Sequence, residues 1–241
     1  HLVFNLTPFY PEGGGQIGDI GQISNSSENI QIIDTKKENN LIIHISEELP
    51  KNISNDFTAK VDSEHRNSSS RNHSATHLLH HVLREELGNH VEQKGSLVSP
   101  DHLRFDFTHF SKLSDDEIRN IERKVNEMIS KNISLEEYNN MPISEAKKMG
   151  AMMLFGEKYA DAVRVIKFEH SLELCGGTHI SSTEEIGAFK IVSEGSISAG
   201  IRRIEAITGD KHKKHTKEME NTLNKIKSLI KNTDLIQGIK D

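Results

Sequence analysis

Two short segments, far apart in the sequence, each carry a pair of potential metal-binding side chains spaced four residues apart. The first segment, NHSATHLLHH, contains His73 and His77, and the second, ELCGGTHI, contains Cys175 and His179. If both pairs bind one ion, the two segments must lie side by side in the folded chain. This requirement constrains the fold more than any other feature of the sequence.

Helix geometry supports the first half of such a site. Residues four apart on an α-helix lie one turn above each other, so His73 and His77 can present imidazoles to a single ion. Alone, this spacing is more simply explained by surface or core histidines, and His77 and His81 repeat it. In the second segment Gly176 and Gly177 allow a tight turn that brings thiolate and imidazole together. Nitrogen and sulfur ligands of this kind are typical of Zn²⁺. The predicted zinc ligands are His73, His77, Cys175 and His179.

The residues between the first two histidines bear on the role of the ion. Zinc proteases with a His-Glu-x-x-His motif carry a glutamate there as general base. Here Ser74, Ala75 and Thr76 occupy these positions, so a protease of that type is not expected. Structural zinc sites usually hold four protein ligands, and catalytic sites hold three and a water. Four candidate ligands leave both arrangements open.

The composition indicates a polar protein of one large domain or two smaller ones. The 241 residues are 34% hydrophobic and 27% charged, and no run approaches the ~18 apolar residues that a membrane helix requires. The chain begins with His1 and shows no signal-peptide pattern, so we expect a segment of a longer protein. A single cysteine indicates a reducing compartment, and a cytoplasmic location is expected. With a net charge of −6, any contact with RNA needs a local basic patch.

Residues 1–65 are expected to form a small β-barrel-like subdomain that includes a glycine-rich motif. Short apolar runs rich in β-branched residues (IGDIGQI, NIQIID, LIIHI, FTAKVD) are separated by Gly, Asn, Ser and Pro, as in a series of short strands. The polar stretch SEHRNSSSRN (63–72) lacks apolar periodicity and is interpreted as a linker. The helix that carries the two histidines is predicted to begin after an N-cap at Asn72.

Residues 66–209 are expected to form an α/β sandwich with a mostly antiparallel sheet, which makes the chain α+β. Ser114 and Glu117 form a capping box that predicts the start of a second helix. A short helix is predicted over residues 142–150. Strands are predicted at KGSLV and HLRFDF, on either side of a turn, and at ISLEEYN, AVRVIKF, AFKIVSEG and GIRRIEAITG.

The last segment, residues 210–241, is predicted to be a helix. Its apolar residues are spaced four, three and four apart among Lys and Glu, and they are Met219, Leu223, Ile226 and Ile230. Such a narrow stripe favours packing against something outside the segment, such as a coiled-coil partner. Docking of the helix on its own domain is about equally favoured.

Six motifs resemble those of the editing region of alanyl-tRNA synthetase, in the expected order. TPFYPEGGGQIGD resembles the family's Thr-x-Phe-Tyr-x-x-x-Gly-Gly-Gln motif, and NHSATHLLH and ELCGGTH match its two metal-ligand motifs. HVEQKGSLV, GAMMLFGEKYADAVRV and GIRRIEAITG match as well. The resemblance extends over residues 7–209, which is nearly the whole chain.

The resemblance implies a zinc-dependent hydrolase that cleaves serine or glycine from tRNA(Ala), within an enzyme that ligates alanine to tRNA(Ala) using ATP. An alanine pocket excludes glycine only weakly, and serine adds a single hydroxyl. An apolar pocket distinguishes amino acids that differ by one methylene-sized group by only ~10–200-fold, so a second site that removes the wrong amino acid is required. The expected partner is the acceptor end of tRNA(Ala), and no contact with a membrane is expected. A homo-oligomer formed through the region after residue 210 is also expected.

The resemblance also implies roles for single residues. Thr7 matches the position whose hydroxyl recognises serine, although a threonine there also suits turn capping. Gln93 matches an active-site glutamine whose amide both donates and accepts hydrogen bonds. Gly14 and Gly15 are expected in the pocket wall rather than only permitting a tight turn. Arg202 and its arginine neighbour point to opposite faces of a strand, so only one faces a given tRNA groove, and Arg202 is the candidate for substrate contact.

Three alternatives are weighed against this interpretation. A free-standing trans-editing protein would share the motifs, but it would begin with Met and would not need the last helix. The editing domain of threonyl-tRNA synthetase has a related ligand pattern, but FYPEGGGQIGD and GIRRIEAITG fit the alanyl family better. A non-catalytic, zinc-stabilised RNA-binding module belongs to a different functional class, and deacylation of Ser-tRNA would distinguish it.

Overall fold

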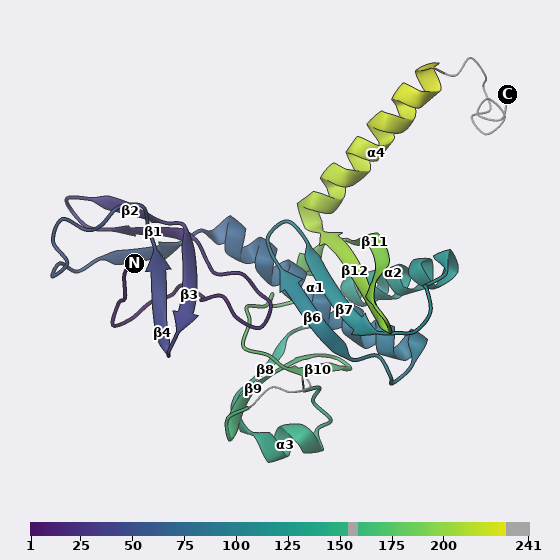
Figure 1. Ribbon diagram of the computed structural model, residues 1–241, viewed down its shortest axis with the longest axis horizontal. Coiled ribbons are helices and arrows are strands. Elements are labelled where there is room, and N and C mark those ends of the chain that lie inside the picture. The colour runs from purple at the N-terminus through teal and green to yellow at the C-terminus, as the bar shows by residue number, and fades with distance from the viewer. Residues whose placement is uncertain (154–158, 230–241) are drawn as a thin grey trace.

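The computed structural model describes residues 1–153 and 159–229. Its elements form an α+β fold whose sheets are mostly antiparallel, as the sequence predicts. A long helix, α1 (Ser63–Leu87), runs from a small β unit, residues 1–62, into the body of the molecule, where the largest sheet and the remaining elements lie (Figure 1).

The β unit is built from two small sheets with the orders β2-β1-β5 and β3-β4. Their bounds are β1 (Gly21–Ser24), β2 (Asn29–Ile32), β3 (Asp34–Glu38), β4 (Leu41–Ile45) and β5 (Thr58–Val61). The prediction of a barrel is wrong for these residues. Closure requires every strand to pair on both sides, whereas β2 and β5 form the two edges of a three-stranded sheet. Strands of four or five residues enclose only a small core, made by Phe9, Ile23, Ile30 and Ile32.

The helix α1 begins ten residues earlier than predicted, so the predicted linker is wrong. Asp62 is the N-cap, and its side chain accepts a hydrogen bond from the backbone N–H of His65. The first turns lack apolar periodicity because their buried side chains are polar and meet polar partners. Ser70 lies 2.8 Å from the hydroxyl of Thr178, and Asn72 donates to the carbonyl of Ser99 at 2.7 Å.

An ion pair fastens the β unit to α1. The carboxylate of Asp19, which is 1% exposed, accepts from Nε of Arg66 at 2.8 Å and from the backbone N–H of Tyr10 at 2.6 Å. Because Asp19 lies in the glycine-rich motif, the ion pair fixes that motif beside the first turns of the helix.

The largest sheet has the antiparallel order β11-β12-β7-β6. Its strands are β6 (Gln93–Val98), β7 (Leu103–Thr108), β11 (Phe189–Ser198) and β12 (Ile201–Thr208). The helices α1 and α2 (Asp115–Ser130) pack against it and share its core, which includes Leu78, Leu79, Phe105, Ile121 and Ile204. The predicted capping box of α2 is confirmed, with both the Ser114 and the Glu117 hydrogen bonds present.

A third sheet, of order β10-β9-β8, carries the second ligand segment to α1. Its strands are β8 (Glu136–Pro142), β9 (Ala162–Phe168) and β10 (Ser171–Leu174), with α3 (Ile143–Lys148) between the first two. A 3₁₀ helix, η1 (Thr183–Ile186), comes after the ligand segment. Strand β10 was not predicted. It ends directly before Cys175, so its pairing with β9 decides where the thiol lies.

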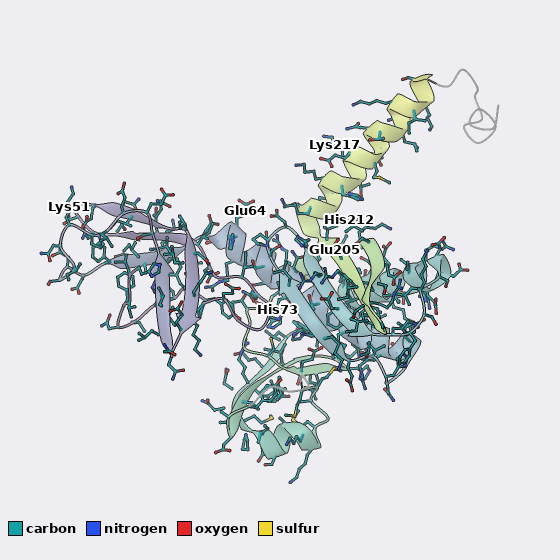
Figure 2. All side chains as sticks on the ribbon, in the orientation of Figure 1. Lys51, Glu64, His73, Glu205, His212 and Lys217 are labelled. Carbon is teal, nitrogen blue, oxygen red and sulfur yellow. The ribbon has the colours of Figure 1, made fainter. Side chains whose placement is uncertain are left out.

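The last described helix, α4 (Gly209–Leu229), extends away from the other elements (Figure 1). Figure 2 shows its side chains, Lys217 among them, in open space along the helix. Met219, Leu223 and Ile226 are 62%, 50% and 40% exposed, and Ile230 lies outside the described residues. No helix in the described part of the chain is both long and apolar enough to cross a membrane.

Candidate metal centre

The structure brings the four predicted ligands together. His73 and His77 project from successive turns of α1, and Cys175 and His179 lie on the loop after β10. One potential ligand atom from each residue lies within 4.8 Å of the others. The sulfur of Cys175 is 3.3 Å from Nε2 of His73 and 3.3 Å from Nε2 of His179. The donor atoms therefore converge on one point.

Outer contacts orient two of the imidazoles. Nδ1 of His73 lies 2.7 Å from the side-chain oxygen of Gln16, and Nδ1 of His179 lies 3.0 Å from the hydroxyl of Ser74. Metal-binding histidines commonly use one ring nitrogen as ligand and hold the other in a hydrogen bond. Three imidazoles and a thiol, two of the rings held in this way, fit the donor set of a tetrahedral zinc site.

The glycines of the ligand loop permit this close approach. A Cβ atom on Gly177 would lie 2.0 Å from a ring carbon of His73, so a larger residue cannot fit there. Arg164 holds the same loop from the other side, because its guanidinium donates to the carbonyls of Cys175 and Gly177 at 3.0 and 2.6 Å. Glu137 balances the charge of Arg164 at 2.9 Å.

Burial governs the protonation of the site. It lowers the pKa of His73 to about 3, with a further contribution from His77, and it lowers the pKa of His179. The rings are therefore neutral, which is the form that binds a metal ion. Burial also raises the pKa of the Cys175 thiol to about 12. A bound cation would reverse this effect, because it stabilises the thiolate.

A buried carboxylate lies beside the ligands. Glu173 is 7% exposed, and its oxygens lie 3.2 Å from Nδ1 of His80 and 3.7 Å from Nε2 of His77. Burial raises its pKa, but the two histidines outweigh that effect, and the net pKa lies below the usual range. Glu173 was not expected from the sequence, because the strand that carries it, β10, was not predicted, and this strand ends at Leu174, one residue before Cys175.

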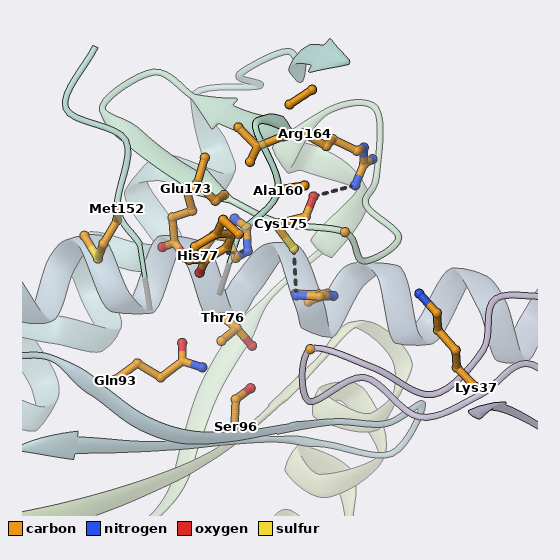
Figure 3. A pocket seen from close by; sticks show the side chains of 17 residues that line it. Lys37, Thr76, His77, Gln93, Ser96, Met152, Ala160, Arg164, Glu173 and Cys175 are labelled. Carbon is orange, nitrogen blue, oxygen red and sulfur yellow. Dashed lines mark hydrogen bonds and ion pairs between the residues drawn. The ribbon is translucent and has the colours of Figure 1, made fainter. Parts of the chain in front are cut away.

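A cavity of about 510 Å³ opens beside the four ligands. Its wall combines the glycine-rich loop of the β unit with α1, β6, β9 and the ligand loop. Figure 3 shows Thr76 between α1 and β6, with Gln93 and Ser96 on the strand opposite and Cys175 and Glu173 across the cavity. Volumes of 300–1,000 Å³ are typical of small-molecule sites. Of the predicted site residues, those that line it are Gly14, His73, His77, Gln93 and Cys175.

The other predicted substrate contacts lie elsewhere. Thr7 does not line the cavity: its hydroxyl is 2.7 Å from Nε2 of His44 and accepts from the backbone N–H of Phe9 at 3.1 Å. It thus caps a turn inside the β unit. Gly15, at a φ of 82°, packs against Ser96, whose backbone oxygen would lie 2.9 Å from an added Cβ.

The two neighbouring arginines both bind carboxylates. Arg202 donates from Nε to Glu194 at 2.6 Å, and Arg203 makes a two-point contact with Asp106 at 2.6 and 2.8 Å. Glu194 therefore balances the positive charge of Arg202 within the sheet. Arg202 does not line the cavity.

Thr76 is a second cavity residue, beside Glu173, that was not expected from the sequence. It follows His73 by three residues, so helix geometry alone places both side chains on the same face. Its hydroxyl donates to the carbonyl of Asn72 at 2.8 Å. The spacing was therefore a sufficient signal, whereas Gln16 and Arg164 needed the tertiary structure.

Comparison with known proteins gives two family matches. The profile described as "Threonyl and Alanyl tRNA synthetase second additional domain" matches residues 163–205. The profile described as "tRNA synthetases class II (A)" matches residues 1–66. The first match contains Arg164 and the ligand loop, and the second contains the glycine-rich motif.

Individual relatives match along almost the entire chain. Alanine–tRNA ligase of Flavobacterium psychrophilum is 54% identical over 248 residues, covering 99% of this chain and 28% of the relative. The ligase of Bacteroides fragilis is 54% identical over 96% of this chain and 27% of the relative. That of Cytophaga hutchinsonii is 53% identical over 100% and 28%. The chain spans little more than a quarter of the length of these relatives.

Proposed function

The chain belongs to the alanine–tRNA ligase family, and on that premise we propose that this segment hydrolyses the ester bond of Ser-tRNA(Ala) and Gly-tRNA(Ala). The observation that carries the proposal is the convergence of four metal-binding side chains, three of which (His73, His77 and Cys175) line a cavity of about 510 Å³. A purely structural metal site would not need an open cavity beside its ligands.

The metal in this proposal is Zn²⁺, held by His73, His77, Cys175 and His179. When bound, it would polarise the ester carbonyl or lower the pKa of a water toward ~7. The protein's own contribution is to keep three imidazoles neutral and to direct two of them, His73 and His179, toward the sulfur, as the contacts of Gln16 and Ser74 support.

We assign recognition of the serine hydroxyl to Thr76 in place of Thr7. Thr76 lines the cavity one residue before His77, whereas Thr7 is engaged with His44 in the β unit. Because Thr76 donates its own proton to Asn72, its oxygen lone pairs are free to accept a hydrogen bond from serine. Alanine lacks that hydroxyl, so correctly charged tRNA gains nothing from this contact.

Gln93 and Gly14 complete the proposed substrate site. The amide of Gln93 can donate to the ester and accept from a water, so it can orient both reactants. Gly14 offers backbone next to open space, because an added Cβ would meet nothing within 4 Å. A terminal adenosine can therefore approach the glycine-rich loop closely.

The wider setting is part of the proposal. The parent enzyme would ligate alanine to tRNA(Ala) with ATP, and the partner of this segment would be the acceptor end of that tRNA. We place the protein in the cytoplasm, where the single cysteine, Cys175, would stay reduced. We also propose self-association through the region after residue 210.

The decisive experiment is a deacylation assay on Ser-, Gly- and Ala-tRNA(Ala), with and without a zinc chelator. We expect hydrolysis of the serine and glycine esters, loss of both on chelation, and little hydrolysis of the alanine ester. A protein that binds zinc and tRNA but cleaves none of the three would instead be a zinc-stabilised RNA-binding module.

Replacing one ligand separates the role of the metal from that of the pocket. Cys175→Ala is expected to lose zinc and to lower serine release by at least ~100-fold, as removal of a major electrostatic contribution does. Retained serine release in a zinc-free Cys175→Ala protein would refute metal-assisted hydrolysis.

A further inference from the structure

One fully buried side chain of the β unit reaches the metal centre without being a ligand. Gln16 is 0% exposed. Its side-chain oxygen lies 2.7 Å from Nδ1 of His73 and accepts from the backbone N–H of Thr178 at 3.0 Å. Its amide nitrogen donates to the Thr178 hydroxyl at 2.9 Å. One amide thus contacts both ligand-bearing segments.

The backbone around Gln16 is fixed independently of the histidine. The carbonyl of Gly15 accepts from the N–H of Val98 at 2.7 Å, and the N–H of Ile17 donates to the carbonyl of Val98 at 3.1 Å. The loop therefore extends the edge of β6, and the Gln16 side chain is directed inward before any ion binds. Asp19 holds the same motif to α1 through Arg66.

The chemistry of the contact selects one form of His73. The backbone N–H of Thr178 donates to the side-chain atom of Gln16 that faces His73, which identifies it as the amide oxygen, and an amide oxygen can only accept. The proton of the neutral imidazole must therefore lie on Nδ1, which leaves the lone pair of Nε2 facing the sulfur of Cys175 at 3.3 Å. The opposite tautomer would place two acceptors 2.7 Å apart.

We propose that Gln16 is a positioning residue of the metal centre: it fixes the tautomer and ring orientation of His73 and so makes metal affinity depend on the β unit. The inference rests on the proposed function, since it requires the four side chains to bind a metal ion. By linkage, an ion bound to His73 also strengthens the docking of the β unit on α1.

The test measures zinc affinity of the full chain by competition with a chromophoric chelator, which requires no tRNA. Gln16→Met removes the acceptor at similar size, and we expect zinc binding 10- to 100-fold weaker. The matched control is Gln31→Met on the exposed face of β2, with unchanged affinity. In the zinc-loaded wild type, ¹⁵N NMR should place the His73 proton on Nδ1 in a hydrogen bond, and this signature should be lost in Gln16→Met.

A conservative variant keeps the inference testable if Gln16→Met does not fold. Gln16→Glu retains an acceptor toward His73, and the rotatable Thr178 hydroxyl can donate to its second oxygen. We expect zinc affinity within a few-fold of wild type and an unchanged His73 signature.

The outcomes separate this inference from the proposed function. If the wild type binds zinc and Gln16→Met binds it equally well, the inference is wrong and the metal centre stands. If Gln16→Glu loses as much affinity as Gln16→Met, the acceptor is not what matters and the inference is also wrong. If the wild type binds no zinc, both fail together.

Discussion

At the scale of single residues, Gly177 and Thr76 at the site and His44 in the β unit are the positions where small changes should have measurable effects. Gly177 has room for no Cβ, Thr76 contributes one hydroxyl to the cavity, and His44 is buried among aromatic rings. Each position can be tested with a variant that has a matched control in the same chain.

Thr76→Val should lower the hydrolysis of Ser-tRNA(Ala) relative to Gly-tRNA(Ala) by about tenfold. The variant keeps the shape but removes the acceptor for the serine hydroxyl, and one such hydrogen bond contributes ~1 kcal/mol or somewhat more. The measurement is the ratio of the two deacylation rates. Thr222→Val is the control, since Thr222 makes the same backbone contact on α4, far from the cavity. An unchanged ratio of the two rates would mean that a residue other than Thr76 recognises the serine hydroxyl.

Gly177→Ala should weaken zinc binding by at least ~10-fold, because the new methyl group displaces the His73 ring that it would otherwise meet at 2.0 Å. Gly176→Ala is the neighbouring control, with nothing within 4 Å of its Cβ. Its free energy of unfolding should stay within about 0.5 kcal/mol of wild type. Chelator competition measures the zinc affinity, and urea unfolding measures the free energy of unfolding. Equal zinc affinity in the two variants would contradict the packing argument.

Acid should destabilise the fold through His44. Burial lowers the pKa of His44 below 6.5, so the folded state binds fewer protons than the unfolded state. The resulting stability is present at pH 7.5 and is lost as the pH falls below ~6.5. Urea unfolding at pH 7.5 and 5.5 should show a larger loss in wild type than in His44→Gln, because other groups contribute equally to both. Parallel losses would show that His44 does not titrate as expected.

At the scale of elements, the helices differ in how strongly the local sequence specifies them. The amphipathic helix α2 carries a complete capping box, and its start was predicted correctly. The first buried side chains of α1 are serines and an asparagine, Ser69, Ser70 and Asn72, and the start of this helix was not predicted correctly. When a helix face is buried against polar partners, its residues are polar and form hydrogen bonds. The sequence then lacks the regular apolar spacing by which a buried helix face is recognised.

The capping box of α2 should be measurable in isolation from the site. Ser114→Ala removes the acceptor for the backbone N–H of Glu117, and such caps contribute about 1 kcal/mol to the free energy of unfolding. Ser130→Ala is the control at the other end of the helix, where the hydroxyl only donates to the carbonyl of Asn126. Thermal or urea unfolding compares the two variants. A cost at Ser130 equal to that at Ser114 would argue against a capping effect.

At the scale of the whole molecule, the metal centre lies where three structural units meet. The β unit supplies Gln16, α1 supplies His73 and His77, and the sheet that ends in β10 supplies Cys175. The helix α4, by contrast, contacts β11 and β12 of the main sheet and carries three exposed apolar residues, Met219, Leu223 and Ile226.

This apolar stripe should drive self-association. Met219, Leu223 and Ile226 are spaced as in a coiled-coil seam and are 62%, 50% and 40% exposed. Sedimentation velocity should show a weight-average mass that rises with concentration and falls to that of a monomer in Leu223→Glu. The control Asn224→Glu adds the same charge beside the stripe and should leave association unchanged. A monomer at all concentrations in every variant would contradict the proposal.

The features that depend on spacing along the chain follow from the amino-acid sequence alone. Helix periodicity predicted that His73 and His77 share a face, the capping box located α2, and the motif order identified the family. Alternation along a strand gave no such signal for Glu173, because strand β10 was not among the predicted strands and ends before Cys175.

Contacts between groups that are distant in the sequence became known from the folded chain. Nothing near Gln16 in the sequence says that its amide ends against His73, or that Thr7 turns toward His44 and away from the cavity. The physical reason is that helix periodicity and capping patterns relate only residues that lie within one or two helical turns of each other. A buried polar contact across the chain exists only once packing has excluded water and left each donor a single partner.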